Sequence, residues 1–315
     1  TSGSNVTLVD AGAIDLGAST VSGTYAVTAT ADGDITDSGV LAITGTSTLT
    51  AADEQSIILD QSSTFGTVAF VASSGNLKNV TINDSNALDL SALTLAQVSG
   101  AGGNLTVTAG GAVTDSGTLV IPGTTTISAS GQDVTLNDSS NNFGTATITG
   151  ANVAVTDTNA IALGASTISG TYSITADGNI TDDGAQVITG LTTLGAGSGI
   201  ITLDNSSNDF QGGLVIQSSG NVVLRDVGAI DLGAATVSGT YSVTAGGAIT
   251  DSGTQEITGV TTLAAGSGND ITLDTSTNNF AAAVVITSGR NVAITDEDAI
   301  DLGAATVSGT YSVTA

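Results

Sequence analysis

A seventeen-residue segment, AIDLGAATVSGTYSVTA, occurs unchanged at residues 229–245 and 299–315. Close copies begin at Ala13 and Ala160, and a degenerate copy begins at Ala87. A fixed period of this kind indicates a repeat architecture, in which each unit packs mainly against its neighbours. We therefore expect residues 1–315 to form one continuous segment of a longer repetitive protein, with repeats starting near 13, 87, 160, 229 and 299.

Each repeat is too long for one turn of a solenoid and divides into three segments. In the repeat that includes residues 234–303, the segments are 234–253, 254–281 and 282–303, and each holds three short runs of alternating apolar residues. Such alternation is typical of half-buried β-strands, with Ile230, Leu232, Tyr241 and Val243 on the inward face. The pattern predicts an all-β, right-handed parallel β-helix with three strands per coil, about 23 residues per coil and three coils per repeat of about 70 residues.

An array of β-sandwich domains, one for each repeat, is the alternative fold. It requires a linker or a Pro or Gly hinge between domains. No such linker is visible, and Pro122 is the only proline in the chain. The period therefore favours the solenoid.

Charge excludes several classes of partner. The chain carries 29 acidic residues and only three basic ones, Lys78, Arg225 and Arg290, for a net charge of −26. Nucleic acids and anionic membrane surfaces need basic side chains to neutralise their phosphates, so we expect neither as a partner. No apolar run approaches the length of a membrane span, so we expect no membrane insertion. We expect each basic side chain to pair with a nearby acid, such as Asp226.

The acidic residues recur with the repeat, and this argues against an enzyme. Glycoside hydrolysis needs one pair of carboxylates in different environments, whereas these acids are repeated. The chain has no His and no Cys, so the usual nucleophilic triads are absent. We expect no enzymatic activity and no cofactor.

Calcium is the one metal that the acids suggest, because it binds several carboxylate oxygens. The densest cluster comprises Asp296, Glu297, Asp298 and Asp301. Equivalent acids three coils apart would lie roughly 14 Å from one another, too far to share an ion. The simpler interpretation is that Asp residues, such as Asp37 and Asp251 in the TDSG segments, bond their own turns and solvate the surface.

Aromatic and amide residues also recur at fixed repeat positions. We expect the tyrosines and phenylalanines to fill the core, because Leu105 replaces tyrosine in the second repeat. The asparagines that precede the phenylalanines are candidates for a stacked amide ladder. These structural positions are Tyr25, Tyr172, Tyr241, Tyr311, Phe143, Phe210, Phe280, Asn208, Asn278 and Asn279.

Threonine-rich strands raise the possibility of ice binding. Segments such as residues 46–50 and 124–128 recur once per repeat. A flat face that matches ice needs threonine on every coil. The sequence therefore favours the simpler interpretation that threonine is a good strand residue.

The recurring phrase NNF, SGRNVAI, AIDLG, TYSVTAGGAITDSG and ITLD runs through the whole chain, for example at residues 278–280, 288–294 and 240–253. It resembles the β-strand repeats of filamentous-haemagglutinin-like bacterial exoproteins. The resemblance implies a large surface adhesin exported through an outer-membrane barrel by two-partner secretion. It implies an extracellular location at the bacterial cell surface.

Together these features predict a rigid extracellular shaft or filament segment of a secreted adhesin. Its partners would be flanking repeats or neighbouring copies, and other parts of the protein would contact host cells, neighbouring cells or matrix. One alternative is a fibre or sheath protein that polymerises end to end. A lesser alternative is an acidic matrix protein that binds calcium or polysaccharide.

Overall fold

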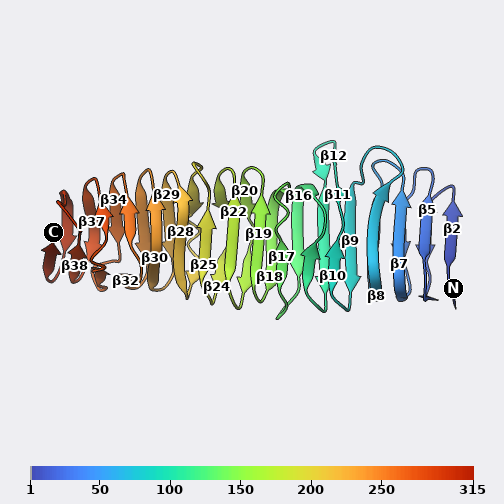
Figure 1. The fold of residues 1–315 in the computed structure, drawn as a ribbon, viewed down its shortest axis with the longest axis horizontal. Helices are drawn as coiled ribbons and strands as arrows, with labels where there is room; N and C mark the ends of the chain where they lie inside the picture. Colours follow the sequence, from blue (N-terminus) through green and yellow to red (C-terminus); the bar gives the residue numbers. More distant parts are fainter. Residues whose placement is uncertain (1) are drawn as a thin grey trace. The chain divides into compact units, whose positions relative to one another are not determined.

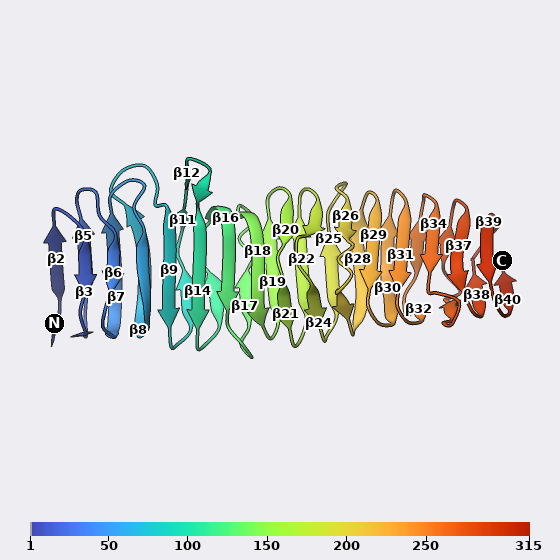
Figure 2. The same cartoon turned by 180° about the vertical axis from the view of Figure 1, so that it is seen from behind.

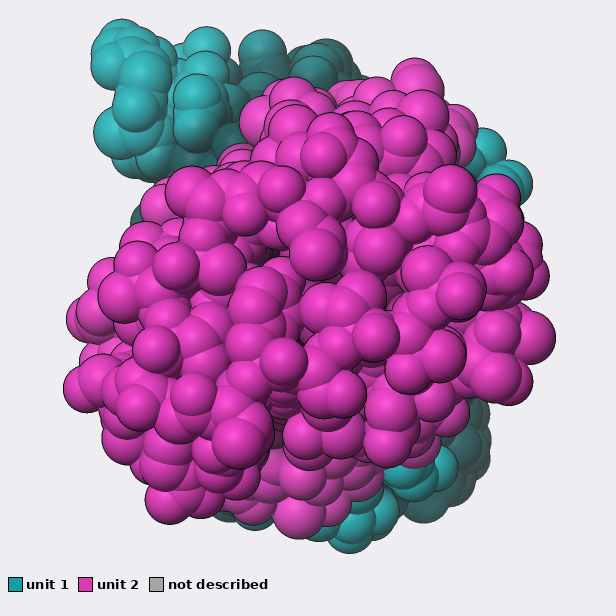
Figure 3. All heavy atoms as spheres, turned by 90° about the vertical axis from the view of Figure 1, so that its left-hand side faces the viewer, with its two compact units in different colours: residues 1–157 teal, residues 158–315 magenta. Residues whose placement is uncertain are grey.

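The computed structural model describes residues 2–315, which belong to two compact units, residues 1–157 and 158–315. Figure 3 shows the two units in different colours. All regular elements of the described residues are β-strands, and no helix occurs among them. Inward-facing Val, Ile and Leu alternate with outward Thr, Ser and Asp, which is the pattern that favours strands with one buried face.

The strands of unit 1 are β1 (Ser2–Gly3), β2 (Val6–Asp10), β3 (Ile14–Leu16), β4 (Ser19–Val21), β5 (Tyr25–Ala29), β6 (Ile35–Asp37), β7 (Leu41–Ala51), β8 (Ile57–Ala72), β9 (Asn79–Asp84), β10 (Leu88–Leu90), β11 (Leu93–Thr94), β12 (Gln97–Val98), β13 (Ala101–Gly102), β14 (Asn104–Ala109), β15 (Val113–Asp115), β16 (Leu119–Ser128), β17 (Val134–Leu136), β18 (Asn142–Gly150) and β19 (Val153–Asp157).

The strands of unit 2 are β20 (Ile161–Leu163), β21 (Ser166–Ile168), β22 (Tyr172–Ala176), β23 (Ile180–Asp182), β24 (Gln186–Ile188), β25 (Thr192–Gly195), β26 (Ile201–Leu203), β27 (Asp209–Phe210), β28 (Gly213–Ser219), β29 (Val222–Asp226), β30 (Ile230–Val237), β31 (Tyr241–Ala245), β32 (Ile249–Asp251), β33 (Gln255–Ile257), β34 (Thr261–Ala264), β35 (Ile271–Leu273), β36 (Asn279–Phe280), β37 (Val284–Gly289), β38 (Val292–Thr295), β39 (Leu302–Val307) and β40 (Tyr311–Thr314).

Successive turns of each unit stack through parallel strand pairs (Figures 1 and 2). The fold class is therefore a parallel β-solenoid, as predicted, with about 15 turns in the chain and about 21 residues per turn. A β-sandwich array would pair its strands antiparallel, so the alternative fold is wrong. The one antiparallel pair among the described strands is the small β12–β13 hairpin.

The number of turns per repeat differs from the prediction of three. In unit 2, one column of paired strands runs through β22, β25, β28, β30, β32, β35, β38 and β40. It makes seven steps between Tyr172 and Tyr311, which occupy the same position two repeats apart. The intervening copy at Tyr241 lies in a different column, in β31 between β29 and β34. One repeat therefore makes three and a half turns, and equivalent residues of successive repeats face opposite sides.

Unit 1 follows the same rule. A column of paired strands leads in seven steps from Val6 in β2 to Val153 in β19, again two repeats later. The turns are therefore shorter than predicted. Many turns consist of three strands, such as β32, β33 and β34. Other turns consist of two: the long strand β30 pairs with both β32 and β33, and its own turn contains only one further strand, β31.

The core is a stack of inward side chains from every strand. The inward parity expected for Ile230, Leu232, Tyr241 and Val243 is confirmed, because all four are buried. The largest fully buried side chains are Tyr25, Tyr172, Tyr241, Phe143, Phe210 and Phe280. Tyr311 belongs to the last strand, β40, and is 37% exposed.

The corners between strands need glycine where backbones of successive turns touch. A Cβ on Gly259 would collide with the carbonyl oxygen of Gly239 in the turn before it. Gly190 stands in the same relation to Gly170. These contacts hold neighbouring turns at the close spacing that parallel pairing requires.

Candidate functional site

A buried aspartate closes one corner of each interior repeat. It stands three residues before the repeats that start at 87, 160, 229 and 299, and its exposed fraction is at most 3% in all four cases; these residues are Asp84, Asp157, Asp226 and Asp296. Asp226 ends β29, and its two carboxylate oxygens accept the backbone N–H groups of Phe210 and Gly228, each at 2.6 Å. The carboxylate thereby fixes the preceding phenylalanine in the core.

The same bond occurs in neighbouring repeats. Asp157 accepts the N–H of Phe143 at 2.6 Å, and Asp296 accepts that of Phe280 at 2.9 Å. Both oxygens of Asp226 therefore bond to the backbone of the solenoid.

A second carboxylate joins successive turns through an asparagine. Asp251 accepts the side-chain N–H of Asn278 at 2.7 Å, and the Asn278 amide oxygen accepts the N–H of Gln255 at 2.9 Å. The Gln255 side chain then donates to the carbonyl oxygens of Gly233 and Gly253. The TDSG aspartates therefore bond the next turn of the solenoid, rather than their own turn as predicted.

The network is repeated with small changes. Asp182, Asn208 and Gln186 make equivalent bonds, with 2.7 Å between the Asn208 amide and Asp182. Asn208 and Asn278 do not bond to one another, so the proposed amide ladder is wrong. They cannot stack, because successive repeats place them on opposite sides of the turn.

Burial raises the pKa of three carboxyl groups, those of Asp37 in a TDSG segment and of the corner aspartates Asp84 and Asp226. Backbone N–H bonds oppose the shift, from Gln61 and Asp60 for Asp37 and from Phe210 and Gly228 for Asp226. Desolvation of the charged carboxylate is the larger effect in each case.

We expect the melting temperature to rise as the pH is lowered from neutrality toward about 4. The folded chain binds protons to these three groups more readily than the unfolded chain, whose carboxyl pKa is near 3.8. Their contribution to stability is therefore complete below that value and is lost as the pH rises through their folded pKa. Thermal melts followed by circular dichroism measure the effect. A melting temperature that falls over this range would contradict it, and Asp84→Asn should flatten the dependence.

The residues of the predicted calcium cluster differ in their burial and in their hydrogen-bond partners. Asp296 is buried and bonded to the N–H groups of Phe280 and Asp298. Glu297 accepts the side-chain N–H of Asn279 at 3.1 Å, whereas Asp301 is exposed and immediately precedes β39. No group of three or more His, Cys, Asp or Glu residues that could hold a metal occurs within residues 2–315.

The basic residues differ in their partners. Arg290 makes a two-pronged bond to Asp270, with both contacts at 2.8 Å, and lowers the pKa of that carboxyl. This is the one ion pair in the described part of the chain. Asp226, the partner suggested for Arg225, binds backbone N–H groups instead.

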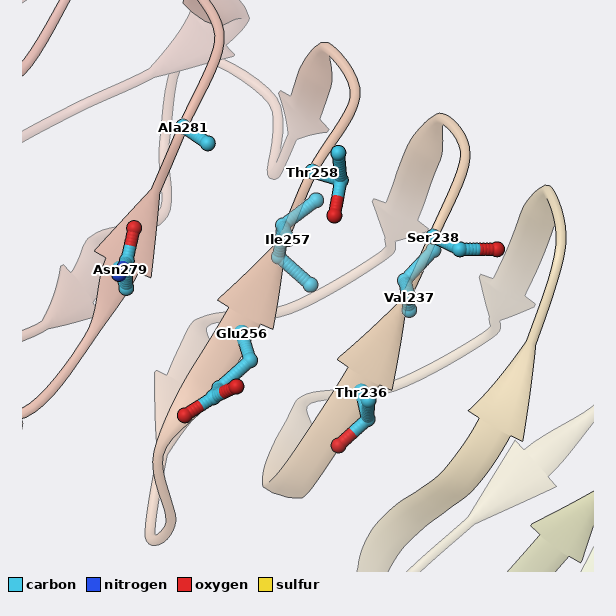
Figure 4. A pocket seen from close by; sticks show the side chains of 8 residues that line it. All are labelled: Thr236, Val237, Ser238, Glu256, Ile257, Thr258, Asn279 and Ala281. Atoms are coloured by element: carbon cyan, nitrogen blue, oxygen red, sulfur yellow. The ribbon is translucent and has the colours of Figure 1, made fainter.

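One surface depression, with a volume of about 200 Å³, lies across three successive turns of unit 2. Figure 4 shows its lining side chains, which belong to strands β30, β33 and β36 and to the residues just after them. Thr236, Glu256 and Asn279 are register partners there, so the depression is a groove between side-chain rows. Glu256 is the one acidic residue in its lining, which leaves no carboxylate pair for hydrolysis.

A model of the family described as repeats of unknown function (DUF5649) matches residues 3–72, 77–149, 150–217, 219–287 and 289–315. The chain belongs to the DUF5649 repeat family. Each DUF5649 match begins ten residues before one of the predicted repeat starts, so the two sets of spacings agree. No curated protein and no solved structure matches the chain. No helix able to span a membrane occurs among the described residues.

Two polar features of the DUF5649 repeat escape the sequence interpretation. The buried aspartate has a signal, because it always precedes the alanine of the AIDLG segment by three residues. The glutamines at 186 and 255 have a weaker signal, because Leu41 and Leu119 occupy the equivalent place in the first two repeats.

Proposed function

We propose that this chain is a rigid spacer, a shaft segment of a secreted bacterial surface adhesin related to filamentous haemagglutinin. One observation carries the proposal: the polar side chains that recur between repeats bond to the backbone of the solenoid itself. Asp226, Asn278 and Gln255 are examples, and all three are buried. Residues that recur in this way serve the fold, as a spacer requires.

Further support comes from composition. A chain without cysteine can cross an outer-membrane pore unfolded, since no disulfide forms beforehand. Its net charge of −26 favours solubility outside the cell. Together with the resemblance to filamentous-haemagglutinin-like exoproteins, these features support our proposal that the protein is exported by two-partner secretion to the bacterial cell surface.

The partners we propose are further turns of the same repeat, from flanking chain or from a second copy. Within the solenoid each turn covers the inward side chains of the turn before it, and Leu232 is fully buried in this way. A further turn of the same kind would pack in the same manner, because open parallel edges invite strand pairing.

A distance measurement tests the spacer. The chain has no cysteine, so spin labels on Ser173→Cys and Ser312→Cys would be specific. These positions lie in one column seven turns apart, so we expect a narrow distance distribution centred at about 34 Å. Duplicating residues 172–310 should add about the same length again to the distance between the outer labels.

Two results would refute the spacer proposal. One is a broad distribution in the native chain, and the other is a duplication that fails to lengthen the separation. An antibody that labels permeabilised cells but not intact producing cells would refute the proposed location.

A further inference from the structure

Four successive strands of unit 1 carry the same kind of outward side chain. The register aligns Thr81, Thr106, Thr126 and Thr147 in one row along β9, β14, β16 and β18. A second row comprises Asn83, Thr108, Ser128 and Thr149. Figure 2 shows these strands next to one another, and we call these eight residues the threonine face. The rows bring together side chains that occupy different positions of the sequence repeat.

The threonine face is a regular grid. Parallel strands lie about 4.8 Å apart and alternate residues of a strand about 6.7 Å apart, which fixes both spacings. The register runs without a shift over all four strands in these two rows. Fully buried residues alternate with the grid positions, among them Ile82, Val107, Ile127 and Ile148, and they pack these strands against the core.

The hydroxyl groups of the face are not used by the fold. Within residues 2–315, none of its seven hydroxyls makes a side-chain hydrogen bond. Outward threonines elsewhere do so, such as Thr114 with Asp89 at 3.0 Å and Thr254 with Thr277. The face therefore presents hydroxyl and methyl groups to whatever lies outside it.

The charge and the side-chain composition of the threonine face limit the kinds of ligand that it can bind. None of the eight residues is charged, in a chain of net charge −26, so an ionic ligand would find no partner. The face contains no aromatic residue of the kind that anchors protein interfaces, and glycines Gly103, Gly123 and Gly144 occupy the corner beside it. A neutral, regularly spaced grid of hydroxyl and methyl groups is complementary to a neutral and regular lattice of water molecules.

We propose that the threonine face binds the surface of ice. Its hydroxyls would continue the hydrogen-bonded lattice, while the methyl groups exclude disordered water between the rows. The sequence argument against ice binding required threonine on every coil. The strand register meets that requirement over four turns with six threonines, one serine and one asparagine.

The test compares two equivalent threonines in the full chain. Thr126 and Thr262 occupy equivalent positions in the second and fourth repeats, because each is the second residue of a matching pair, Thr125–Thr126 and Thr261–Thr262. Thr262 differs in its neighbours on the adjoining strands, which are Ser242 and Val285. We expect the native chain to shape growing ice crystals, to show thermal hysteresis and to become enriched in slowly growing ice. Thr126→Tyr should abolish all three effects, whereas Thr262→Tyr should preserve them.

Circular dichroism melts check that both tyrosine variants fold. Thr126→Val keeps the shape of the side chain and removes its hydroxyl, and we expect this variant to lose the three effects on ice only in part. The inference is overturned if the native chain leaves ice growth unchanged, or if Thr126→Tyr and Thr262→Tyr behave alike. Binding to crystalline chitin or cellulose that Thr126→Tyr prevents, with no effect on ice, would also overturn it. None of these outcomes bears on the spacer distances.

Discussion

Replacing Tyr241 with alanine is expected to lower the free energy of unfolding by about 4 kcal/mol. The side chain is 1% exposed and lies in the core between Val222 and Thr261 of the adjoining turns. Its removal would leave a cavity that the stacked strands cannot close, because parallel pairing fixes their spacing on both sides. Urea unfolding followed by circular dichroism measures the loss as a shift of the midpoint.

Tyr241→Phe is the matched control. In the described structure the Tyr241 hydroxyl is buried without a hydrogen bond. At the repeat position where Ser166 lies beside Tyr172, the repeat of Tyr241 has Ala235, which has no hydroxyl to offer. Removing an unpaired buried hydroxyl relieves a desolvation cost, so we expect this variant to equal or exceed the native stability by up to about 1 kcal/mol. A loss comparable to that of the alanine variant would contradict the assigned packing.

Asp226→Ala is expected to cost about 3 kcal/mol. The change removes a buried acceptor that takes two backbone N–H groups and leaves the N–H of Phe210 buried without a partner. Bonds to a charged acceptor are the stronger class, and an orphaned buried donor adds its own desolvation cost. The measurement is again the urea midpoint, at neutral pH.

Asp10 provides the comparison at the same repeat position. Its side chain is exposed, and among the residues that the structure describes it accepts one hydrogen bond, from the N–H of Gly12 at 2.8 Å. We expect Asp10→Ala to cost less than about 1 kcal/mol. Equal losses at the two positions would show that burial does not determine the role of this aspartate.

The period, the strand class and the inward parity were accessible from the sequence. Copies as similar as 229–245 and 299–315 establish the period, and the alternation in Tyr241, Val243 and Ala245 establishes which side chains point inward. Both are local properties of the chain. They do not depend on how many strands complete a turn.

The half-turn offset was not accessible in the same way. Runs of three residues form β32 and β33, whereas β31 is longer, so counting runs does not reveal where a turn closes. Only the pairing of β30 with both β32 and β33 shows that two short strands oppose one long strand. The threonine face depends on the same information, because its rows join strands at different positions of the repeat.

The half-integral number of turns has a consequence for how such a gene can change. Unequal recombination that adds or deletes one copy would lengthen or shorten the product and also reverse the side on which every downstream motif emerges. Exchange of copies in pairs would alter the length alone, since seven complete turns restore the original orientation. Parity of copy number is thus a heritable property of the protein, separate from its size.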